Sequence, residues 1–143
     1  MSARTGFRAG LLAVLVVMAA FGCSSDDDGE LPFAPSDCQK TKPATGHLIV
    51  EITLNAQNTK VPVKVYVGPI EDGQLVKSDS VSVAQFTYEL LADRSYAVTA
   101  RYLVGQDTII AIGSDDITTS ETEYENGFCW EVTDGKVDVR LKL

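Results

Sequence analysis

The chain has 143 residues, of which 20 are acidic and 12 are basic, so its formal net charge is −8. This length allows one ordinary domain, and a hydrophobic fraction of 45% is enough for a packed core, which excludes a wholly disordered chain. The acidic charge excludes nucleic acid as an expected partner, because phosphate binding needs clustered Lys and Arg. One His and three Cys exclude a multi-His or four-Cys zinc site within one chain.

The first 22 residues have the pattern of a secretory signal peptide. Arg4 and Arg8 supply positive charge, and an apolar stretch follows from Gly10 to Phe21. That stretch is shorter than the roughly 20 apolar residues that a membrane-spanning helix needs. We therefore expect residues 1–22 to be cleaved off as a signal peptide and to take no part in the fold of the mature protein.

The signal ends in Ala20-Phe21-Gly22-Cys23, which resembles the lipobox of bacterial lipoproteins, although Leu is usual at the position of Ala20. The resemblance implies that Cys23 is acylated and that its lipid holds the protein on a membrane. The expected localisation is the bacterial cell envelope, on the periplasmic or the surface face of the outer membrane. An ordinary signal peptide with an unrelated Cys and an uncleaved anchor are the alternatives.

Residues 24–37 have the composition of a disordered linker. Five of them are acidic, none is basic, and Gly29, Pro32 and Pro35 disfavour helix and central strand. We expect the lipidated Cys and the acidic flexible linker to occupy residues 23–37. Its beginning, Ser24–Asp28, resembles the acid-rich signals that bring some bacterial lipoproteins to the cell surface, and a solvated spacer is the alternative.

From Cys38 to Leu143, apolar and polar residues alternate with period two, which is typical of strands with one buried and one exposed face. The pattern predicts an all-β domain over residues 38–143, an antiparallel sandwich of about seven or eight strands. Pro62 places its strand at a sheet edge or lets it start late. The expected strands are 47–54, 61–67, 74–81, 84–91, 95–104, 107–113, 127–133 and 136–143, with 117–124 as a further edge strand.

Three segments carry a family resemblance. Val61–Gly68, Phe86–Leu90 and Tyr96–Tyr102 together resemble small prealbumin-like domains, among them the regulatory domains of carboxypeptidases. Leu91–Tyr96 is similar to the turn before the tyrosine corner of immunoglobulin-like sandwiches. The resemblance covers most of residues 46–104 and implies a scaffold without a specific activity, because sandwiches host many functions.

Two cysteines, Cys38 and Cys129, remain once Cys23 is acylated. The exported compartment is oxidising and two is an even number, so we predict a disulfide that joins the end of the linker to a late strand. A redox-active pair is the alternative, but such pairs usually have close spacing.

Aromatic residues allow two interpretations. Trp130 shares a strand face with Phe128 and Val132, so we expect it to lie in the core. The alternative is a sugar-stacking platform that includes other aromatic residues. Its further members would be Tyr66, Tyr102 and Tyr124.

His47 is the only His and falls on the outer face of the first expected strand. Neither a Gly-x-Ser-x-Gly elbow nor a Gly-rich phosphate loop accompanies it. We therefore expect an exposed polar His47, a protein that is not an enzyme, and no cofactor.

The longest connection in the expected fold, Ser114–Asn126, contains five acidic residues and no basic residue. A solvated acidic loop or edge strand is one interpretation, and a calcium-binding loop is the other, although the spacing is not that of an EF-hand. The candidate ligand residues are Asp115, Asp116, Glu121, Glu123, Tyr124 and Glu125.

These features predict a lipid-anchored envelope protein that acts as a non-enzymatic binding or structural module. Its expected partners are the membrane, through the lipid, and a protein or glycan at the envelope. An accessory subunit of an envelope or secretion complex is the alternative. A small hydrolase comes third, because carboxylates are plentiful.

Overall fold

The computed structural model describes residues 29 and 31–143. The expected signal peptide over residues 1–22, the acylated Cys23 and the acidic cluster Ser24–Asp28 lie outside the described residues. In the described part of the chain, no helix is long and apolar enough to cross a membrane.

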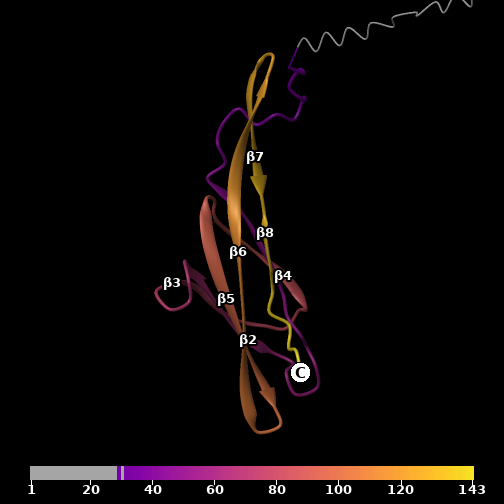
Figure 1. Cartoon of the computed structure of the whole chain (residues 1–143). Helices are drawn as coiled ribbons and strands as arrows, with labels where there is room; N and C mark the ends of the chain where they lie inside the picture. Colours follow the sequence, from indigo (N-terminus) through magenta and orange to yellow (C-terminus); the bar gives the residue numbers. More distant parts are fainter. Residues whose placement is uncertain (1–28, 30) are drawn as a thin grey trace, which may run out of the picture.

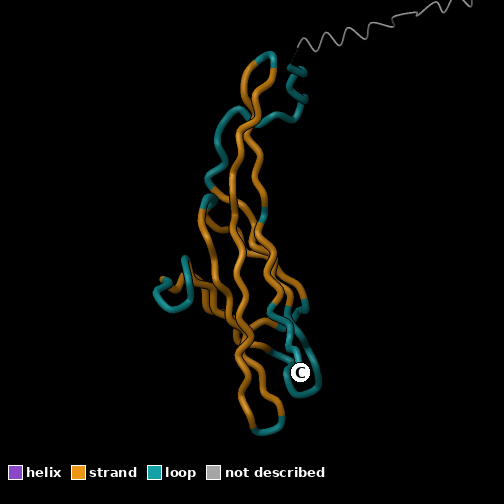
Figure 2. The backbone as a smooth tube through the Cα atoms, in the orientation of Figure 1, coloured by secondary structure: helices purple, strands orange, loops and turns teal. Residues whose placement is uncertain are grey.

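Eight strands form two sheets, which confirms the predicted all-β sandwich (Figures 1 and 2). The smaller sheet has the strand order β4-β1-β8, and the larger has the order β3-β2-β5-β6-β7. The strands are β1 Thr45–Glu51, β2 Val61–Val67, β3 Gln74–Val81, β4 Gln85–Leu91, β5 Arg94–Val104, β6 Asp107–Tyr124, β7 Gly127–Thr133 and β8 Gly135–Asp138.

The core lies between the two sheets and follows the alternation in the sequence. Along β1, β2 and β5 every second side chain points inward, because successive residues face opposite sides of a sheet. Burial of these apolar side chains is the main stabilising contribution to the fold. The fully buried members are Leu48, Val50, Val61, Val63, Val65, Tyr96, Val98, Tyr102, Ile117, Val137 and Val139.

Two features depart from a purely antiparallel fold with short strands. β8 pairs with β1 in parallel, with Val137 opposite Val50, and it ends at Asp138 rather than continuing to Leu143. β6 is one continuous strand of 18 residues, so the further strand expected over 117–124 is confirmed, but it is not an edge strand and the connection expected over 114–116 is wrong. Two partners allow this length, because the half of β6 up to Ile117 pairs with β5 and the half from Thr118 pairs with β7.

Pro62 lies in an interior strand, so the expectation of an edge is wrong. β2 pairs with β3 on one side and with β5 on the other. The pairing of β2 with β5 begins at Val63, one residue after the proline. Because of this late start, the β2–β5 ladder needs no hydrogen bond from the backbone nitrogen of Pro62, which carries no hydrogen.

The turn between β4 and β5 has the geometry expected for a tyrosine corner. The Tyr96 hydroxyl donates a hydrogen bond of 2.7 Å to the Leu91 carbonyl oxygen. Asp93 completes the turn in the left-handed region, with φ at 56°, which Asp tolerates better than most residues. The tyrosine ring is 2% exposed, so this bond fixes the turn to the core.

The molecule is elongated, because β6 runs along its full length (Figure 1). At about 3.3 Å per residue, this strand spans roughly 55–60 Å. The β6–β7 turn lies at one end, beside the beginning of the described chain, and the β5–β6 turn lies at the other. We call the paired region 118–133 the long hairpin.

Candidate functional site

The six candidate calcium ligands lie along β6 and the turn after it, and the structure does not bring them together. Asp115 and Asp116 are neighbours in a strand, so they point to opposite faces. The Asp115 carboxylate accepts a hydrogen bond of 2.7 Å from the Lys136 backbone N–H and thus ties β6 to β8. Glu121 and Glu123 face Trp130 and Phe128 across the long hairpin, while Tyr124 and Glu125 lie at its tip.

A calcium cage needs several oxygen ligands around one point. Asp115 and Glu125 are separated by roughly 30 Å of extended chain at about 3.3 Å per residue. Within residues 29 and 31–143, no group of three or more His, Cys, Asp or Glu side chains is arranged to hold a metal ion.

The expectation that Trp130 belongs to the core is wrong, because its side chain is only partly buried and lies outside the core cluster. On the same face of β7, Phe128 is 49% exposed and Val132 is 36% exposed, whereas Cys129 on the opposite face is buried. β7 pairs with the part of β6 from Thr118 onward and contacts the N-terminal segment, and the smaller sheet approaches this face where Gly46 of β1 lies close to Val132. The face assignment failed because alternation shows which residues share a face, but not which face another layer covers.

An aromatic platform does not form either. Tyr102 is fully buried, Tyr66 lies on the outer face of β2, and Tyr124 lies at the tip of the long hairpin. Trp130 instead has the Lys42 ammonium group 5.2 Å from the centre of its ring. The indole therefore takes part in a cation–π contact within the protein.

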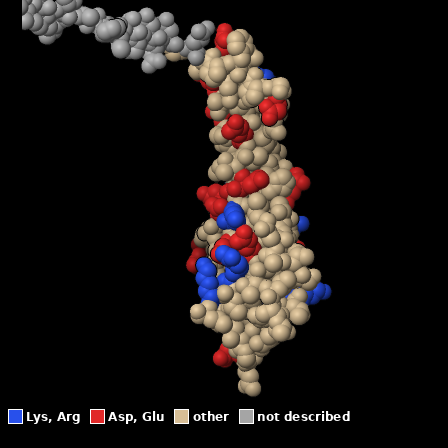
Figure 3. All heavy atoms as spheres, turned by 90° about the vertical axis from the view of Figure 1, so that its right-hand side faces the viewer, with Lys and Arg blue, Asp and Glu red and all other residues tan. Residues whose placement is uncertain are grey.

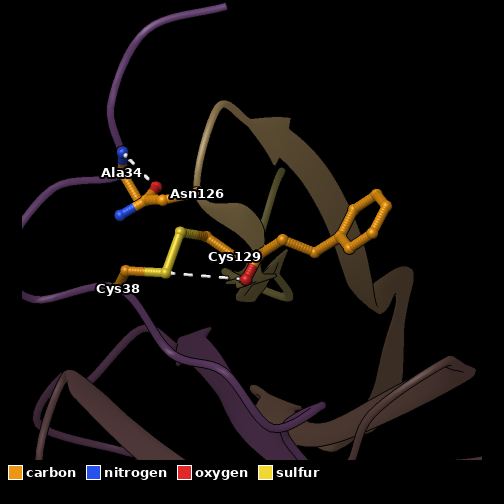
Figure 4. The surroundings of a disulfide bond; sticks show 5 residues. Ala34, Cys38, Asn126 and Cys129 are labelled. Atoms are coloured by element: carbon orange, nitrogen blue, oxygen red, sulfur yellow. Dashed lines mark hydrogen bonds between the residues drawn. A yellow bond between two sulfur atoms is a disulfide. The ribbon is translucent and has the colours of Figure 1, made fainter.

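The predicted disulfide between Cys38 and Cys129 is confirmed (Figure 4). The two Cα atoms are 5.3 Å apart, and the Cys38 sulfur lies 3.7 Å from the Phe128 carbonyl oxygen. Hydrogen bonds on either side extend the contact: the Ala34 N–H donates to the Asn126 side-chain oxygen, and the Trp130 N–H donates to the Gln39 carbonyl oxygen.

These contacts make residues 32–39 part of the folded unit, and we call this stretch the N-terminal strap. Its first contact is made by the Pro32 carbonyl oxygen, which accepts a hydrogen bond from the Glu125 N–H at the hairpin tip. The folded unit thus starts before Cys38. The end of the expected flexible linker lies against the long hairpin, and this covers the free edge of β7.

Behind the strap, Lys42 links three parts of the chain. Its ammonium group lies 2.7 Å from the Asp93 carboxylate in the β4–β5 turn, in addition to its contact with Trp130. Thr119 of β6 donates two hydrogen bonds to the same carboxylate, one from its backbone N–H at 2.8 Å and one from its hydroxyl at 2.7 Å. The Lys42 and Thr119 hydrogen bonds lower the pKa of Asp93 from 3.8 to about 2.

The Asp93 pKa predicts a pH dependence of stability. Because the folded-state pKa is lowered, the ionised carboxylate stabilises the protein above pH 3.8, and this contribution is lost as the pH falls towards about 2. Asp93→Asn keeps a residue that tolerates the left-handed turn and should remove this part of the acid dependence. Urea unfolding of both proteins between about pH 2 and 6 measures it. Parallel plots of unfolding free energy against pH for the two proteins would contradict the role of the Asp93 charge. In a Lys42→Ala background, the effect of Asp93→Asn on the pH dependence should be smaller.

His47 is exposed, as expected for an outer-face residue. Its backbone N–H donates a hydrogen bond of 2.8 Å to the Asp134 carboxylate, and its Nδ1 lies 3.5 Å from the same oxygen. These contacts connect β1 to the turn between β7 and β8.

A groove that the sequence analysis did not identify lies on the outer face of the larger sheet. It has a volume of about 420 Å³. Outward side chains of three neighbouring strands form most of it, and Ile70 closes one side. Its lining residues are Pro62, Lys64 and Tyr66 of β2, Thr99 and Arg101 of β5, Ile110 and Ile112 of β6, and Ile70. We call it the basic–apolar groove.

The apolar part of the groove consists of aliphatic side chains that have no cover in the described structure. Ile110 is 56% exposed and Ile112 is 58% exposed. They stand opposite Arg101 and Thr99 of β5, so an arginine and two isoleucines share one patch of the sheet face. An arrangement of exposed aliphatic groups rimmed by polar groups is typical of a binding surface.

The charges in the groove are unbalanced. Lys64 and Arg101 line it, Lys60 lines an adjoining hollow, and no Asp or Glu lines either. None of these three cations takes part in an ion pair among the described residues. The groove is therefore a locally positive site on a protein whose net charge is −8.

Elsewhere among the described residues, Lys42, Lys136, Arg140 and Lys142 form ion pairs, whereas Lys40, Lys77 and Arg94 do not. Arg140 lies 2.9 Å from Asp138 and 3.8 Å from Glu51, and Lys136 lies 3.1 Å from Glu51. The Arg140 guanidinium holds the pKa of the Asp138 carboxyl well below its usual range. Figure 3 shows Lys and Arg among Asp and Glu over the middle of one face, while the hairpin end carries mainly acidic groups.

One sequence signal points to the groove. In Ile109-Ile110-Ala111-Ile112, apolar residues occupy both faces of the strand, whereas strands with one wet face alternate. Lys64 and Arg101 look like ordinary solvent-facing residues in their own strands. Only the sheet order places them beside these isoleucines.

Comparison of the chain with protein-family models matches no family, and comparisons with curated proteins and with solved structures find no match. These comparisons thus give no support to the resemblance to prealbumin-like domains, and the structure itself supports only the coarser statement of a two-sheet β-sandwich.

Proposed function

We propose that the protein is a lipid-anchored module of the bacterial envelope that binds a partner and catalyses no reaction. The basic–apolar groove is the observation that carries the binding role, because it combines exposed aliphatic groups with unpaired cations. The acylated Cys23 that the sequence predicts supplies the anchor.

The path of the chain into the fold supports a tethered arrangement. The N-terminal strap lies against the long hairpin and is covalently joined to it by Cys38–Cys129. A lipid on Cys23 would hold the hairpin end towards the membrane, because residues 23–31 reach at most roughly 30 Å. Ile112 lies 12 residues before Tyr124 on β6, which sets the groove roughly 40 Å from the hairpin tip.

The test of the anchor is the variant Cys23→Ala. The native protein should sediment with membranes and carry a diacylglyceryl group in intact mass spectrometry, and the variant should lose both properties. Cys38→Ala is the control, because it removes a cysteine without removing the proposed acylation site. A native protein with no lipid and a different N-terminus would contradict the proposal.

A permanent subunit of an envelope or secretion complex is the second candidate, and the exposure of Ile110 and Ile112 favours it. Aliphatic side chains of this size are usually covered in a stable complex. Size-exclusion chromatography of gently solubilised membranes separates the two. A module would elute alone at its own mass, and a subunit would elute in a stoichiometric complex.

A further inference from the structure

We propose that the basic–apolar groove binds an acidic protein segment in extended conformation. This inference rests on the proposed binding function and names the chemistry of the partner. Carboxylates of the segment pair with Lys64 and Arg101, and its apolar side chains pack on Ile110 and Ile112.

The spacing of the groove residues suits an extended chain. Side chains on one face of adjacent strands lie about 4.5–5.5 Å apart, and in an extended segment those of residues i and i+2 lie about 7 Å apart. Arg101 stands opposite Ile110 in the pairing of β5 with β6, and Lys64 stands opposite Thr99 in the pairing of β2 with β5. A segment that lies along the strands, with side chains about 7 Å apart, matches the spacing of Ile110 and Ile112 on β6 and of Thr99 and Arg101 on β5.

The positive charges that line the groove determine that the bound segment is negatively charged. Lys64 and Arg101 line the groove without a carboxylate from the described residues, so an acidic segment gains ion pairs that the protein does not make for itself. The groove is partly open, so salt should weaken these pairs. The net charge of the chain is −8, so its many carboxylates disfavour binding of an acidic segment away from this groove.

The aliphatic residues favour a protein segment over an anionic glycan. The side chains of Ile110 and Ile112 cannot form hydrogen bonds with the hydroxyl groups of a glycan, whereas their burial against apolar side chains of a protein segment is favourable. Tyr66 is the one aromatic residue in the groove lining. A glycan would leave the exposed isoleucines without a suitable partner.

A second copy of this chain fits less well. The acidic part of another copy is its hairpin end, and anchoring on a common membrane would keep all hairpin ends at one height. The groove lies roughly 40 Å farther along the molecule. The copies would have to tilt strongly to meet, so we assign the groove to a different protein.

The test uses the full protein purified in detergent-containing buffer, which suits the chain with or without a lipid on Cys23. The probe is a fluorescein-labelled peptide of about eight alternating Glu and Val residues, which covers the groove at about 3.3 Å per residue. A peptide with Gln in place of every Glu is its neutral control. Fluorescence anisotropy should show binding of the acidic peptide that weakens with salt, and little binding of the neutral peptide.

Two pairs of substitutions should each lower the affinity about tenfold or more. Lys64→Glu with Arg101→Glu reverses the groove charges, and Ile110→Ser with Ile112→Ser removes its apolar part. The matched control is Lys40→Glu with Lys142→Glu, which changes the net charge equally at exposed sites outside the groove lining and should leave the affinity within about twofold. Unchanged melting temperatures show that the variants are folded.

Other outcomes overturn the proposal. Absence of binding, equal binding of the neutral peptide, or equal loss in the control pair would each exclude a groove specific for acidic segments. Binding of polygalacturonate that needs Lys64 and Arg101 but not the isoleucines would assign the groove to an anionic glycan. Dimerisation that the groove variants abolish would assign it to a second copy. All these measurements are independent of Cys23, so a failure of the anchor proposal would be seen only in the Cys23→Ala experiment.

Discussion

Replacing Cys38 and Cys129 together with Ser should lower the melting temperature by about 10–15 °C, equivalent to about 3 kcal/mol. The disulfide joins residues 91 positions apart, and the loop-entropy relation gives roughly 4.6 kcal/mol for a loop of this length. We expect a smaller value, because unfolded chains are already partly compact. Thermal unfolding followed by circular dichroism measures the difference.

The loss of local stability in the variant without the disulfide should be largest at the end of the long hairpin. Besides the disulfide, hydrogen bonds such as that from Ala34 to Asn126 hold the N-terminal strap, and the residues that make it are exposed. Hydrogen exchange should therefore increase in the strap and in β7 before it increases in β2 and β5. Cys23→Ser is the control and should unfold like the native protein. Peptide mapping that finds Cys38 and Cys129 as free thiols would disprove the bond itself.

Tyr102→Phe should destabilise the fold by about 2–4 kcal/mol, because two backbone groups lose the same partner. The tyrosine is fully buried, and its hydroxyl donates a hydrogen bond of 2.7 Å to the Val139 carbonyl oxygen. It also accepts one of 3.1 Å from the Thr53 N–H. This hydroxyl thus connects β5 to the chain after β1 and to the chain after β8. Burial raises the pKa of Tyr102, so the phenol stays protonated.

Urea unfolding measures the effect of Tyr102→Phe as a shift of the midpoint at constant slope. Tyr66→Phe is the matched control, because Tyr66 lies in the groove on the outer face and is only half-buried. Loss of the Tyr66 hydroxyl in this variant should change the free energy of unfolding by less than about 0.5 kcal/mol. A Tyr102→Phe protein as stable as the native one would show that water replaces the hydroxyl.

The strands themselves follow from the sequence, and several expectations are confirmed residue by residue. Val61–Val67 is a strand with the expected bounds, and so is Gly127–Thr133. The buried positions of β1, β2 and β5 follow the predicted alternation of apolar and polar residues, since the period of two is a local property of the backbone. The Cys38–Cys129 bond followed from compartment and count alone.

Features that depend on neighbouring strands could not be predicted. The direction of β8 depends on the space beside β1, where Gly135 lies so close to Leu48 that a Cβ at this glycine would come within 2.8 Å of the leucine. The exposure of Phe128 depends on where the second sheet ends. The composition of residues 23–37 predicts a linker, and it gives no sign of the contacts of the strap, because these are made by backbone atoms and one disulfide rather than by apolar side chains.

By itself, the sequence determined the all-β class, the buried positions of the main strands and the disulfide. The apolar–polar alternation and the number of cysteines can be read directly from the residues involved. Only the tertiary structure decided which outward faces remain open and which charges stay unpaired. Lys64, Arg101 and Ile110 come from three strands, and a groove forms from them only because β2, β5 and β6 are neighbours in one sheet. Strand order is set by the burial of apolar surface over the whole chain, and no local pattern encodes it.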